Sequence, residues 1–287
     1  MKIAIIGAGP AGAMAAVRLV RAGASVALFD PTHPREKPCG GGLTGRALEL
    51  VNGIIDLRSL PAVVVKCATV EGPDCSAHVS LIDCGVTPDS SLLIVSRAVF
   101  DRALADAAIA AGARLVPEKV VDVARDGRRM SVRTDRAAYR FDQVLGADGA
   151  GSVVRKKLAR PFARAQLSVT AGFFVHGTTA SSIVVKTTSE RPGYLWSFPR
   201  TDHLAVGICA GADHRATAGQ LRALSAAWIE EHGLNGHTHL TPYAWPIPSI
   251  GSQRRSEVSL SGDGWMLLGD AAGLVDPLTR EGIYYAL

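Results

Sequence analysis

The first thirty residues alternate between short apolar runs and glycine turns, and this pattern predicts a strand, a helix and a second strand. Residues 2–6 (KIAII) are a continuous apolar run, which is typical of a buried strand. After a glycine turn, residues 11–23 have apolar positions at helical spacing and end in Gly23, a helix stop signal. Residues 25–30 (SVALFD) repeat the strand pattern. Two strands joined by a helix predict a parallel unit with a right-handed crossover.

Strand patterns dominate the rest of the chain and are interrupted by two predicted helices, at residues 96–113 and 218–233. The first of these helices has one apolar face, made of Phe100, Leu104, Ala107, Ala108 and Ala111. The predicted strand regions are residues 60–97, a hairpin at 119–134 around Asp126-Gly127, 141–151, 165–210 and 264–273. The nucleotide-type elements therefore fall in three separate stretches, with strand-rich insertions between them.

The turn after the first strand, GAGPAG at residues 7–12, has the spacing of a dinucleotide-binding fingerprint. Gly7 permits a tight turn, Gly9 lets a diphosphate approach the backbone, and Gly12 lets helix and strand pack closely. The N–H groups at the helix N-terminus can bind phosphate oxygens. Asp30, at the end of the second strand, stands where a carboxylate would accept hydrogen bonds from a ribose. A ligand-free glycine turn is the weaker alternative.

Two later turns also carry groups that could bind a nucleotide cofactor. Asp148-Gly149 ends a predicted strand, and taken alone it is better explained as an ordinary turn. Near the end of the chain a buried strand leads into Gly269-Asp270, whose carboxylate can hold ribityl hydroxyls. Pro277 and Gly282 precede a helix start, where the N–H groups of residues 281–283 can face the anionic edge of a reduced flavin.

Composition narrows the range of partners. Of the 287 residues, 47% are hydrophobic and 20% charged, so a large core is expected and disorder is not. The net charge of +5 is diffuse. Its densest cluster, residues 155–157 with Arg160 and Arg164, has no interleaved aromatics, which favours a solvated face over a nucleic-acid groove. Contact with anionic lipid headgroups remains open.

The five cysteines are Cys39, Cys67, Cys75, Cys84 and Cys209. Their odd number and the lack of a CxxC pair argue against a disulfide framework and against a zinc site, and favour a reducing, cytoplasmic setting. His237 and His239 have a spacing that could bind metal, but no partner ligand is evident, so we expect no metal. The apolar N-terminus contains three glycines and a proline, which speaks against a membrane span there.

Taken together, these stretches resemble the FAD-dependent oxidoreductase superfamily that includes aromatic hydroxylases and geranylgeranyl reductases. The landmarks in chain order are the glycine fingerprint with Asp30, Arg97 before a helix, Asp148-Gly149, and Gly269-Asp270 with Pro277. Two further stretches, KPCGGGLTGRALE at residues 37–49 and YLWSFPRTDHLAVG at residues 194–207, are similar to the geranylgeranyl reductase branch.

The resemblance implies roles for particular residues. Gly40 to Gly42 would let the main chain run beside the flavin ring, with Cys39 close by, although Cys39 is better explained as a small buried hydrophobe. Tyr194, Trp196 and Phe198 alternate and would line a cavity for a prenyl chain, or else simply fill core. The candidate catalytic residues are Cys39, Tyr194 and Trp196. The candidate FAD-binding residues are Gly7, Gly9, Ala11, Gly12, Asp30, Cys39, Gly40, Gly41, Gly42, Arg97, Asp148, Gly149, Gly269, Asp270, Pro277, Gly282 and Ile283.

The expected fold is α/β, with a discontinuous, Rossmann-like FAD-binding domain at residues 1–58, 98–156 and 262–287. An inserted mixed-sheet substrate domain takes residues 59–97 and 157–261. The family pattern departs at Arg280, where a glycine is usual, and the C-terminal helical part of the family is expected to be absent. The helix opening near Glu281 should therefore fray unless the substrate domain holds Ile283, Tyr284 and Leu287 in place.

The expected function is the FAD-dependent reduction of isolated carbon–carbon double bonds in a geranylgeranyl-type isoprenoid, as a step of lipid biosynthesis. Three alternatives stay open: a flavin monooxygenase of the same fold, a truncated, non-catalytic FAD-binding protein, and a prenyl-lipid carrier without redox chemistry, which would not need the nucleotide-binding landmarks. Electrons would come from NADPH or from a protein donor, since no second glycine fingerprint marks a nicotinamide site. We expect a cytoplasmic protein with peripheral membrane contact and no nucleic-acid partner. The prenyl substrate, the proton donor and the oligomeric state do not follow from the sequence.

Overall fold

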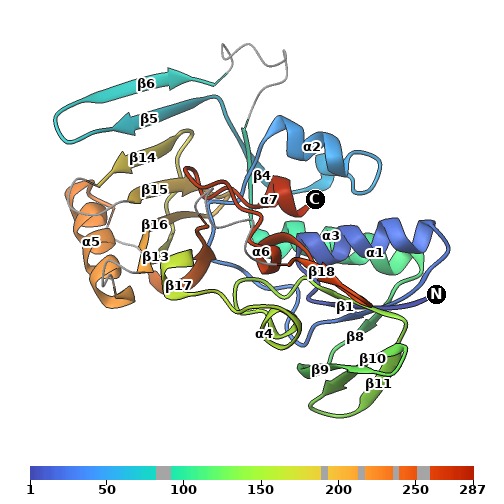
Figure 1. Ribbon diagram of the computed structural model, residues 1–287. Helices are drawn as coiled ribbons and strands as arrows, with labels where there is room; N and C mark the ends of the chain where they lie inside the picture. Colours follow the sequence, from blue (N-terminus) through green and yellow to red (C-terminus); the bar gives the residue numbers. More distant parts are fainter. Residues whose placement is uncertain (82–91, 189–192, 213–216, 235–238, 251–258) are drawn as a thin grey trace.

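The computed structural model describes residues 1–81, 92–188, 193–212, 217–234, 239–250 and 259–287. A largely parallel sheet has the strand order β18-β19-β12-β1-β2-β8 and includes the first strand of the chain (Figure 1). β18 alone runs antiparallel to its neighbour. The strands are β1 (Lys2–Ile6), β2 (Ser25–Phe29), β8 (Arg114–Val116), β12 (Gln143–Gly146), β18 (Ser261–Gly262) and β19 (Trp265–Leu267). Strands distant in sequence thus become neighbours in one sheet.

Both faces of this sheet are buried, which is why its strands are continuous apolar runs. Ile3 and Ile5 point toward α1 (Pro10–Arg21) and α3 (Arg97–Ala111). Ala4 and Ile6 point to the opposite side, where they join a core shared with a three-stranded antiparallel sheet. That sheet consists of β9 (Val120–Asp126), β10 (Arg129–Thr134) and β11 (Ala138–Phe141). The predicted α/β class is confirmed by this arrangement and by the fold of similar proteins described below.

A second large sheet has the strand order β17-β13-β16-β15-β14-β5-β6 and mixes parallel with antiparallel pairs. Its strands are β5 (Cys67–Glu71), β6 (Ser76–Ser80), β13 (Leu167–His176), β14 (Ile183–Thr187), β15 (Gly193–Pro199), β16 (His203–Gly211) and β17 (Leu240–Pro248). Helix α5 (Ala218–Glu231) covers one face through Leu221, Trp228 and Ile229. The opposite face is left to form a wall of the cavity described below.

A small sheet, β3 (Gly42–Leu43), β7 (Leu92–Val95) and β4 (Ala62–Val65), connects the two parts of the molecule. β3 comes from the first predicted FAD-binding segment, whereas β4 and β7 come from the first predicted insertion. We retain the division into an FAD-binding and a substrate-binding domain as a proposal, with this sheet at their junction. The remaining helices are α2 (Gly45–Val51), α4 (Val153–Leu158), α6 (Gly269–Ala272), α7 (Ile283–Ala286), and the short 3₁₀ turns Leu57–Ser59 and Arg164–Gln166.

Several local features were not predicted. Strand β17 contains three prolines, yet it pairs along its length with β13 at the edge of the large sheet, where a strand can do without N–H donors on one side. The basic cluster at residues 155–157 was interpreted as a solvated face, which is wrong for Arg155. Its side chain is 1% exposed, lies 3.8 Å above the ring of Phe162, and donates to the carbonyl oxygen of Ala271.

The last helix packs against α1, α2 and α6. Ile283 is buried in a cluster with Met14 of α1, Leu43 and Phe100, and Leu287 packs against the same cluster. The sequence predicted that this helix would fray unless the substrate domain held it, and whether it frays stays a prediction. A helix this short is not stable in isolation, so these tertiary contacts must stabilise it.

Candidate functional site

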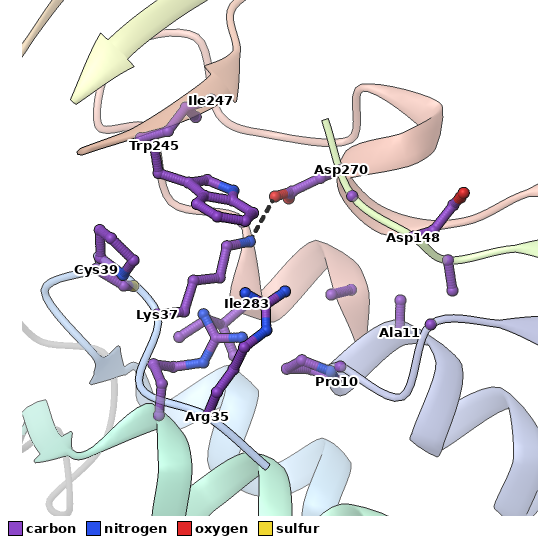
Figure 2. A pocket seen from close by; sticks show the side chains of 18 of the residues that line it. Pro10, Ala11, Arg35, Lys37, Cys39, Asp148, Trp245, Ile247, Asp270 and Ile283 are labelled. Carbon is purple, nitrogen blue, oxygen red and sulfur yellow. Dashed lines mark hydrogen bonds and ion pairs between the residues drawn. The ribbon is translucent and has the colours of Figure 1, made fainter. Parts of the chain in front are cut away.

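A cavity of about 540 Å³ lies between the parallel sheet, the small sheet and the large mixed sheet. One end is formed by the turn between β1 and α1, and the other by aromatic side chains of β15 and β17. Figure 2 shows Pro10 and Ala11 on one side and Trp245 with Ile247 on the other. Among the predicted site residues, Gly12, Gly269 and Pro277 do not line it.

The three fingerprint glycines have different surroundings. Gly7 has a φ of 101°, and a Cβ there would overlap the carbonyl oxygen of Ala147. A Cβ on Gly12 would overlap the carbonyl oxygen of Gly7. Gly9 is different, because a Cβ there would find only the ring of His33, at 3.8 Å. No close protein contact explains this third glycine, and it faces the cavity at the N-terminus of α1. The space fits a phosphate group bound to that helix terminus.

Asp30, the predicted ribose ligand, lines the cavity and already accepts several hydrogen bonds. Its carboxylate accepts from the N–H of Ala8 at 3.0 Å and the N–H of Thr32 at 2.9 Å. The ring of His33 approaches it at 2.8 Å. Burial works against ionisation, but the hydrogen bond and charge of His33, with these N–H groups, hold the pKa of Asp30 well below its usual range. Asp30 is therefore a fixed carboxylate at this end of the cavity.

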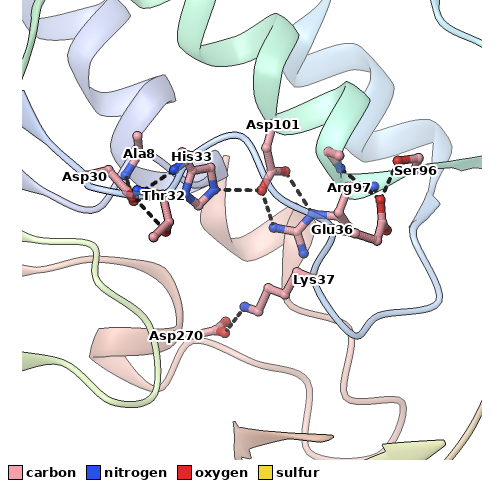
Figure 3. Close-up of polar contacts among 11 residues, drawn as sticks. Ala8, Asp30, Thr32, His33, Glu36, Lys37, Ser96, Arg97, Asp101 and Asp270 are labelled. Atoms are coloured by element: carbon pink, nitrogen blue, oxygen red, sulfur yellow. Dashed lines mark hydrogen bonds and ion pairs between the residues drawn. The ribbon is translucent and has the colours of Figure 1, made fainter. Parts of the chain in front are cut away.

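Arg97 is buried at the start of α3 and also lines the cavity. It forms two hydrogen bonds of 2.8 Å with Asp101, one helical turn later. Burial lowers the pKa of Arg97, but the charge and hydrogen bonds of Asp101 outweigh it and raise that pKa. The N-terminus of α3 is capped from a distance, since Glu36 accepts from the N–H groups of Arg97 and Ala98 (Figure 3).

The glycine run follows the cavity wall and packs against protein on its other side. A Cβ on Gly40 would lie 3.0 Å from the ring of Phe198. Gly41 has a φ of 68°, and its Cβ would overlap the carbonyl of Val95 and the guanidinium of Arg200. The sequence suggested that a flavin ring excludes side chains here. The protein packing alone already requires glycine at position 41.

Arg200 holds this loop from behind. It is 1% exposed and donates to the carbonyl oxygens of Gly40, at 2.5 Å, and Cys39, at 2.9 Å. Burial lowers the pKa of Arg200. Because Arg200 follows β15, these bonds connect the large mixed sheet to the loop at the cavity wall.

The two predicted Asp-Gly and Gly-Asp turns use their carboxylates differently. Asp148 accepts from the hydroxyl of Ser152, at 2.5 Å, and from the N–H of Val153, at 2.6 Å, so its carboxylate caps α4. Burial, the largest effect, raises the pKa of Asp148. Asp270, at the start of α6, instead points into the cavity and forms an ion pair of 2.9 Å with Lys37 (Figure 2). Asp270 is thus a polar group available inside the cavity.

The glycines and the proline around the second turn differ in their surroundings. A Cβ on Gly269 would lie 2.9 Å from the Cβ of Ala11, so this glycine permits the contact between α6 and α1. Gly282 and Ile283 line the cavity at the start of α7. Pro277 is exposed, and its carbonyl oxygen accepts a hydrogen bond from Arg280.

Aromatic side chains form the opposite compartment of the cavity. The predicted strand face is present, since Tyr194, Trp196 and Phe198 of β15 all line the cavity. The rings of Tyr194 and Trp196 lie 5.8 Å apart. The hydroxyl of Tyr194 donates to the carbonyl oxygen of Thr279, and burial raises the pKa of Tyr194. This tyrosine stays protonated at neutral pH.

Sequence reasoning missed Trp245 on β17, which lies 5.0 Å below the guanidinium carbon of Arg35. It also missed His33, Lys37 and Arg200. His33 and Lys37 follow Asp30 within a few positions, and that proximity was the available signal for these two residues. Arg200 lies far along the chain and carried no such signal. Cys39 lines the cavity, and its sulfur accepts from the N–H of Gly41 at 3.3 Å.

Two negative findings concern the described residues only. Within them, no cluster of three or more histidine, cysteine or acidic side chains could hold a metal ion. Within the same residues, no helix is long and apolar enough to cross a membrane. Cys84 and His237 lie outside the described residues.

A parallel sheet whose first strand enters a helix through this glycine turn, with an acid at the end of the next strand, defines a dinucleotide-binding α/β protein. The sequence also matches one particular family. The chain belongs to the FAD-binding domain family, whose profile matches residues 1–286. The resemblance to geranylgeranyl reductases is confirmed by the similar proteins that follow.

Two relatives are similar over almost the whole chain. A menaquinone reductase of Mycobacterium tuberculosis is 32% identical over 308 residues, covering 99% of this chain and 73% of that protein. A digeranylgeranylglycerophospholipid reductase of Methanothrix thermoacetophila is 29% identical over 311 residues, covering 99% of this chain and 74% of the relative.

Among solved structures, a geranylgeranyl bacteriochlorophyll reductase-like protein of Thermoplasma acidophilum has a TM-score of 0.82 at 23% identity. The match covers 99% of this chain and 74% of that one. A flavin-dependent brominase has a TM-score of 0.76 at 19% identity, covering 100% of this chain and 76% of that chain. At these identities the structural similarity shows a common fold and not a common reaction.

Proposed function

We propose that this protein is an FAD-dependent reductase that saturates carbon–carbon double bonds in an isoprenoid chain, as a step of lipid biosynthesis. The observation that carries the proposal is one cavity that runs from the nucleotide-type turn of α1 to an aromatic compartment on β15 and β17. Such a cavity can hold a dinucleotide and an apolar chain end to end. The names of the relatives fit, because the substrates they indicate carry prenyl chains.

The residues that would hold FAD are those at the polar end of the cavity. Gly9 leaves room for the diphosphate, Asp30 and Asp270 offer carboxylates for hydroxyl groups, and Gly282 with Ile283 offer backbone N–H groups. When bound and reduced, FAD supplies a hydride. At the apolar end, Trp196 and Phe198 would position the alkene and exclude water.

An isolated alkene needs a proton as well as a hydride. The π bond is lost, one carbon gains the hydride, the other gains the proton, and the cofactor is oxidised by two electrons. Tyr194 and water are the candidate proton donors. The hydroxyl of Tyr194 is available as a donor because burial keeps it protonated, but it must first release the carbonyl of Thr279.

Electrons would reach the cofactor from NADPH or from a protein donor. We also propose a cytoplasmic protein that contacts the membrane peripherally, since an isoprenoid lipid substrate is drawn from a membrane. A non-catalytic FAD-binding role is the remaining alternative, and it predicts no cofactor reoxidation by any prenyl compound.

A flavin-dependent oxygenation is the second candidate, favoured by the fold shared with a flavin-dependent brominase and with a probable FAD-dependent monooxygenase from Pseudomonas aeruginosa. The two reactions differ in their need for oxygen. In the absence of oxygen, a reductase still consumes double bonds, whereas an oxygenase does not turn over.

The deciding experiment is an anaerobic assay of the purified protein with FAD, a chemical reductant and a geranylgeranyl compound, read by mass spectrometry. We expect product masses that rise by two hydrogens for each double bond lost. The matched control is a Gly9→Val variant, which should not bind FAD. Turnover that appears only when oxygen is admitted would replace the reductase proposal with the oxygenase, and none under either condition would favour the non-catalytic role.

A further inference from the structure

The imidazole of His33 lies between two carboxylates at the nucleotide end of the cavity (Figure 3). Its Nδ1 is 2.8 Å from Oδ2 of Asp30, and its Nε2 is 3.1 Å from Oδ2 of Asp101. An ionised carboxylate only accepts hydrogen bonds, and a neutral imidazole carries a single N–H. Nε2 is within hydrogen-bond distance of Asp101, whereas Nδ1 faces Asp30 at ion-pair distance without forming a hydrogen bond. Two carboxylates on opposite sides of the ring favour the doubly protonated imidazolium through their charge.

The surrounding charges favour this form. Burial lowers the pKa of His33, but hydrogen bonds and charge from Asp101 and Asp30 outweigh it, so the pKa is raised above 6.5. Arg97 neutralises Asp101 through their two hydrogen bonds. The row Asp30, His33, Asp101 and Arg97 is therefore neutral when His33 is protonated, and it carries one net negative charge when His33 loses its proton.

Other charged groups line the same cavity. Arg35 lies 5.0 Å from the ring centre of Trp245, and Lys37 forms an ion pair of 2.9 Å with Asp270. Glu36 caps α3 on the far side of Arg97. Glu118 and Lys119, in the connection from β8 to β9, also line the cavity and have opposite charges. The Glu118 carboxylate is held by the hydroxyl of Tyr139 at 2.9 Å. None of these groups replaces the charge that His33 supplies beside Asp30.

His33 is also next to the phosphate position. A Cβ on Gly9 would lie 3.8 Å from its Nε2 and 3.9 Å from its Cε1, so the ring borders the space that Gly9 leaves at the N-terminus of α1. The side chain of His33 is 9% exposed, so salt screens its charge weakly. An anion bound at the helix terminus would feel both the helix dipole and this imidazolium.

We propose that His33 is a cofactor-binding residue whose imidazolium attracts the FAD diphosphate beside Gly9 and makes FAD binding proton-linked. The proposal rests on FAD as the cofactor and not on the identity of the substrate. It assigns to Asp30 a second role, which is to hold this imidazolium in place.

The linkage has a definite sign. FAD that binds the protonated protein more tightly must also raise the affinity of His33 for its proton. FAD affinity therefore falls as the pH rises through the pKa of His33 in the free protein, and proton uptake accompanies binding in that range. A neutral residue at position 33 removes both effects.

The test is calorimetric titration of the cofactor-free protein with FAD, from about pH 6 to about pH 9.5, in two buffers of different ionisation enthalpy. We compare the parent, His33→Gln and, as a matched control, His78→Gln, whose histidine lies on the exposed β5–β6 hairpin. In the parent and the control, the Kd should rise about tenfold with pH, with proton uptake. In His33→Gln, FAD binding should be weaker than in the parent at low pH, and its Kd should not change with pH.

Two results would overturn the proposal. One is a pH dependence and proton uptake in His33→Gln equal to those of the parent. The other is FAD binding to the parent without proton uptake at any pH. This second measurement tests the proposal even if His33→Gln does not fold. Absence of FAD binding at every pH would instead remove the cofactor assignment, and the role of His33 with it.

Discussion

Glycine serves two different purposes within the six residues of the β1–α1 turn. At Gly7 and Gly12 a side chain would overlap neighbouring backbone, so these positions are required for folding. At Gly9 a Cβ would overlap nothing in the protein and would lie at the cavity. Substitution can therefore separate folding from ligand binding.

We predict that Gly9→Val leaves the unfolding free energy within about 1 kcal/mol of the parent, because its Cβ meets only the His33 ring at ordinary distance. Titration calorimetry should show that FAD binding is lost, since the added side chain fills the phosphate space. Gly12→Val is the control and should fold poorly. Full FAD affinity in a folded Gly9→Val variant would contradict the assignment of this turn.

The Asp30–His33 contact also predicts a pH dependence of stability in the cofactor-free protein. The raised pKa of His33 contributes stability that is complete below its unfolded value and is lost as the pH rises through its folded value. The lowered pKa of Asp30 contributes stability that is lost only at acid pH. Urea unfolding between about pH 6 and about pH 9.5 should therefore show a decline that His33→Gln reduces. An equal decline in both proteins would contradict the prediction.

At the scale of elements, the glycine loop is fixed between two parts of the molecule. Its carbonyls at Cys39 and Gly40 accept from Arg200, and Gly41 fits only because it lacks a side chain. The loop is thus a rigid wall whose position depends on the end of β15. These contacts do not fit a flexible linker.

We predict that Arg200→Met destabilises the protein by about 2–4 kcal/mol, because it leaves two partly buried carbonyls without their donor and removes a buried side chain. Arg200→Lys should recover part of this loss, since an ammonium can reach one carbonyl but not hold both. Denaturant unfolding measures the change, with exposed Arg58→Met as a control expected near zero. In FAD-loaded Arg200→Lys the visible flavin spectrum should also shift. A parent-like stability for Arg200→Met would show that the loop is held by other contacts.

The same element shows how far sequence reasoning could go. The fingerprint turn and its acid were predicted because their spacing is local and each residue has a distinct role. The packing that requires glycine at position 41 was not predicted. Arg200 lies far along the chain and comes next to the loop only in the folded protein. Asp148 and Asp270 looked alike in sequence, yet one caps α4 and the other enters the cavity. Sequence patterns predict elements and leave such long-range partners undetermined.

At the scale of the whole molecule, the cavity has a polar end and an aromatic end that belong to different sheets. This separation predicts that a substitution at one end can impair binding there without changing binding at the other end. Trp196→Leu should raise the KM for a geranylgeranyl substrate by about tenfold or more, through lost contact with the apolar chain, and leave the Kd for FAD unchanged. Trp228→Leu, on the α5 side of the large sheet, is the control and should affect stability but not KM. Equal loss of FAD affinity in Trp196→Leu would mean that the two ends are not separate.

The parallel sheet has a consequence for the order in which the protein is made. Its central strand β1 lies early in the chain, whereas β19, Asp270 and Ile283, which complete the sheet and the cavity, come after all strands of the mixed sheet. During translation the mixed sheet can therefore pair its strands from β13 to β17 before β19 is made. Until then the edge of the parallel sheet beside β12 has no partner strand. The cavity is complete only after these later residues have been made, so the mixed sheet can form before FAD binds.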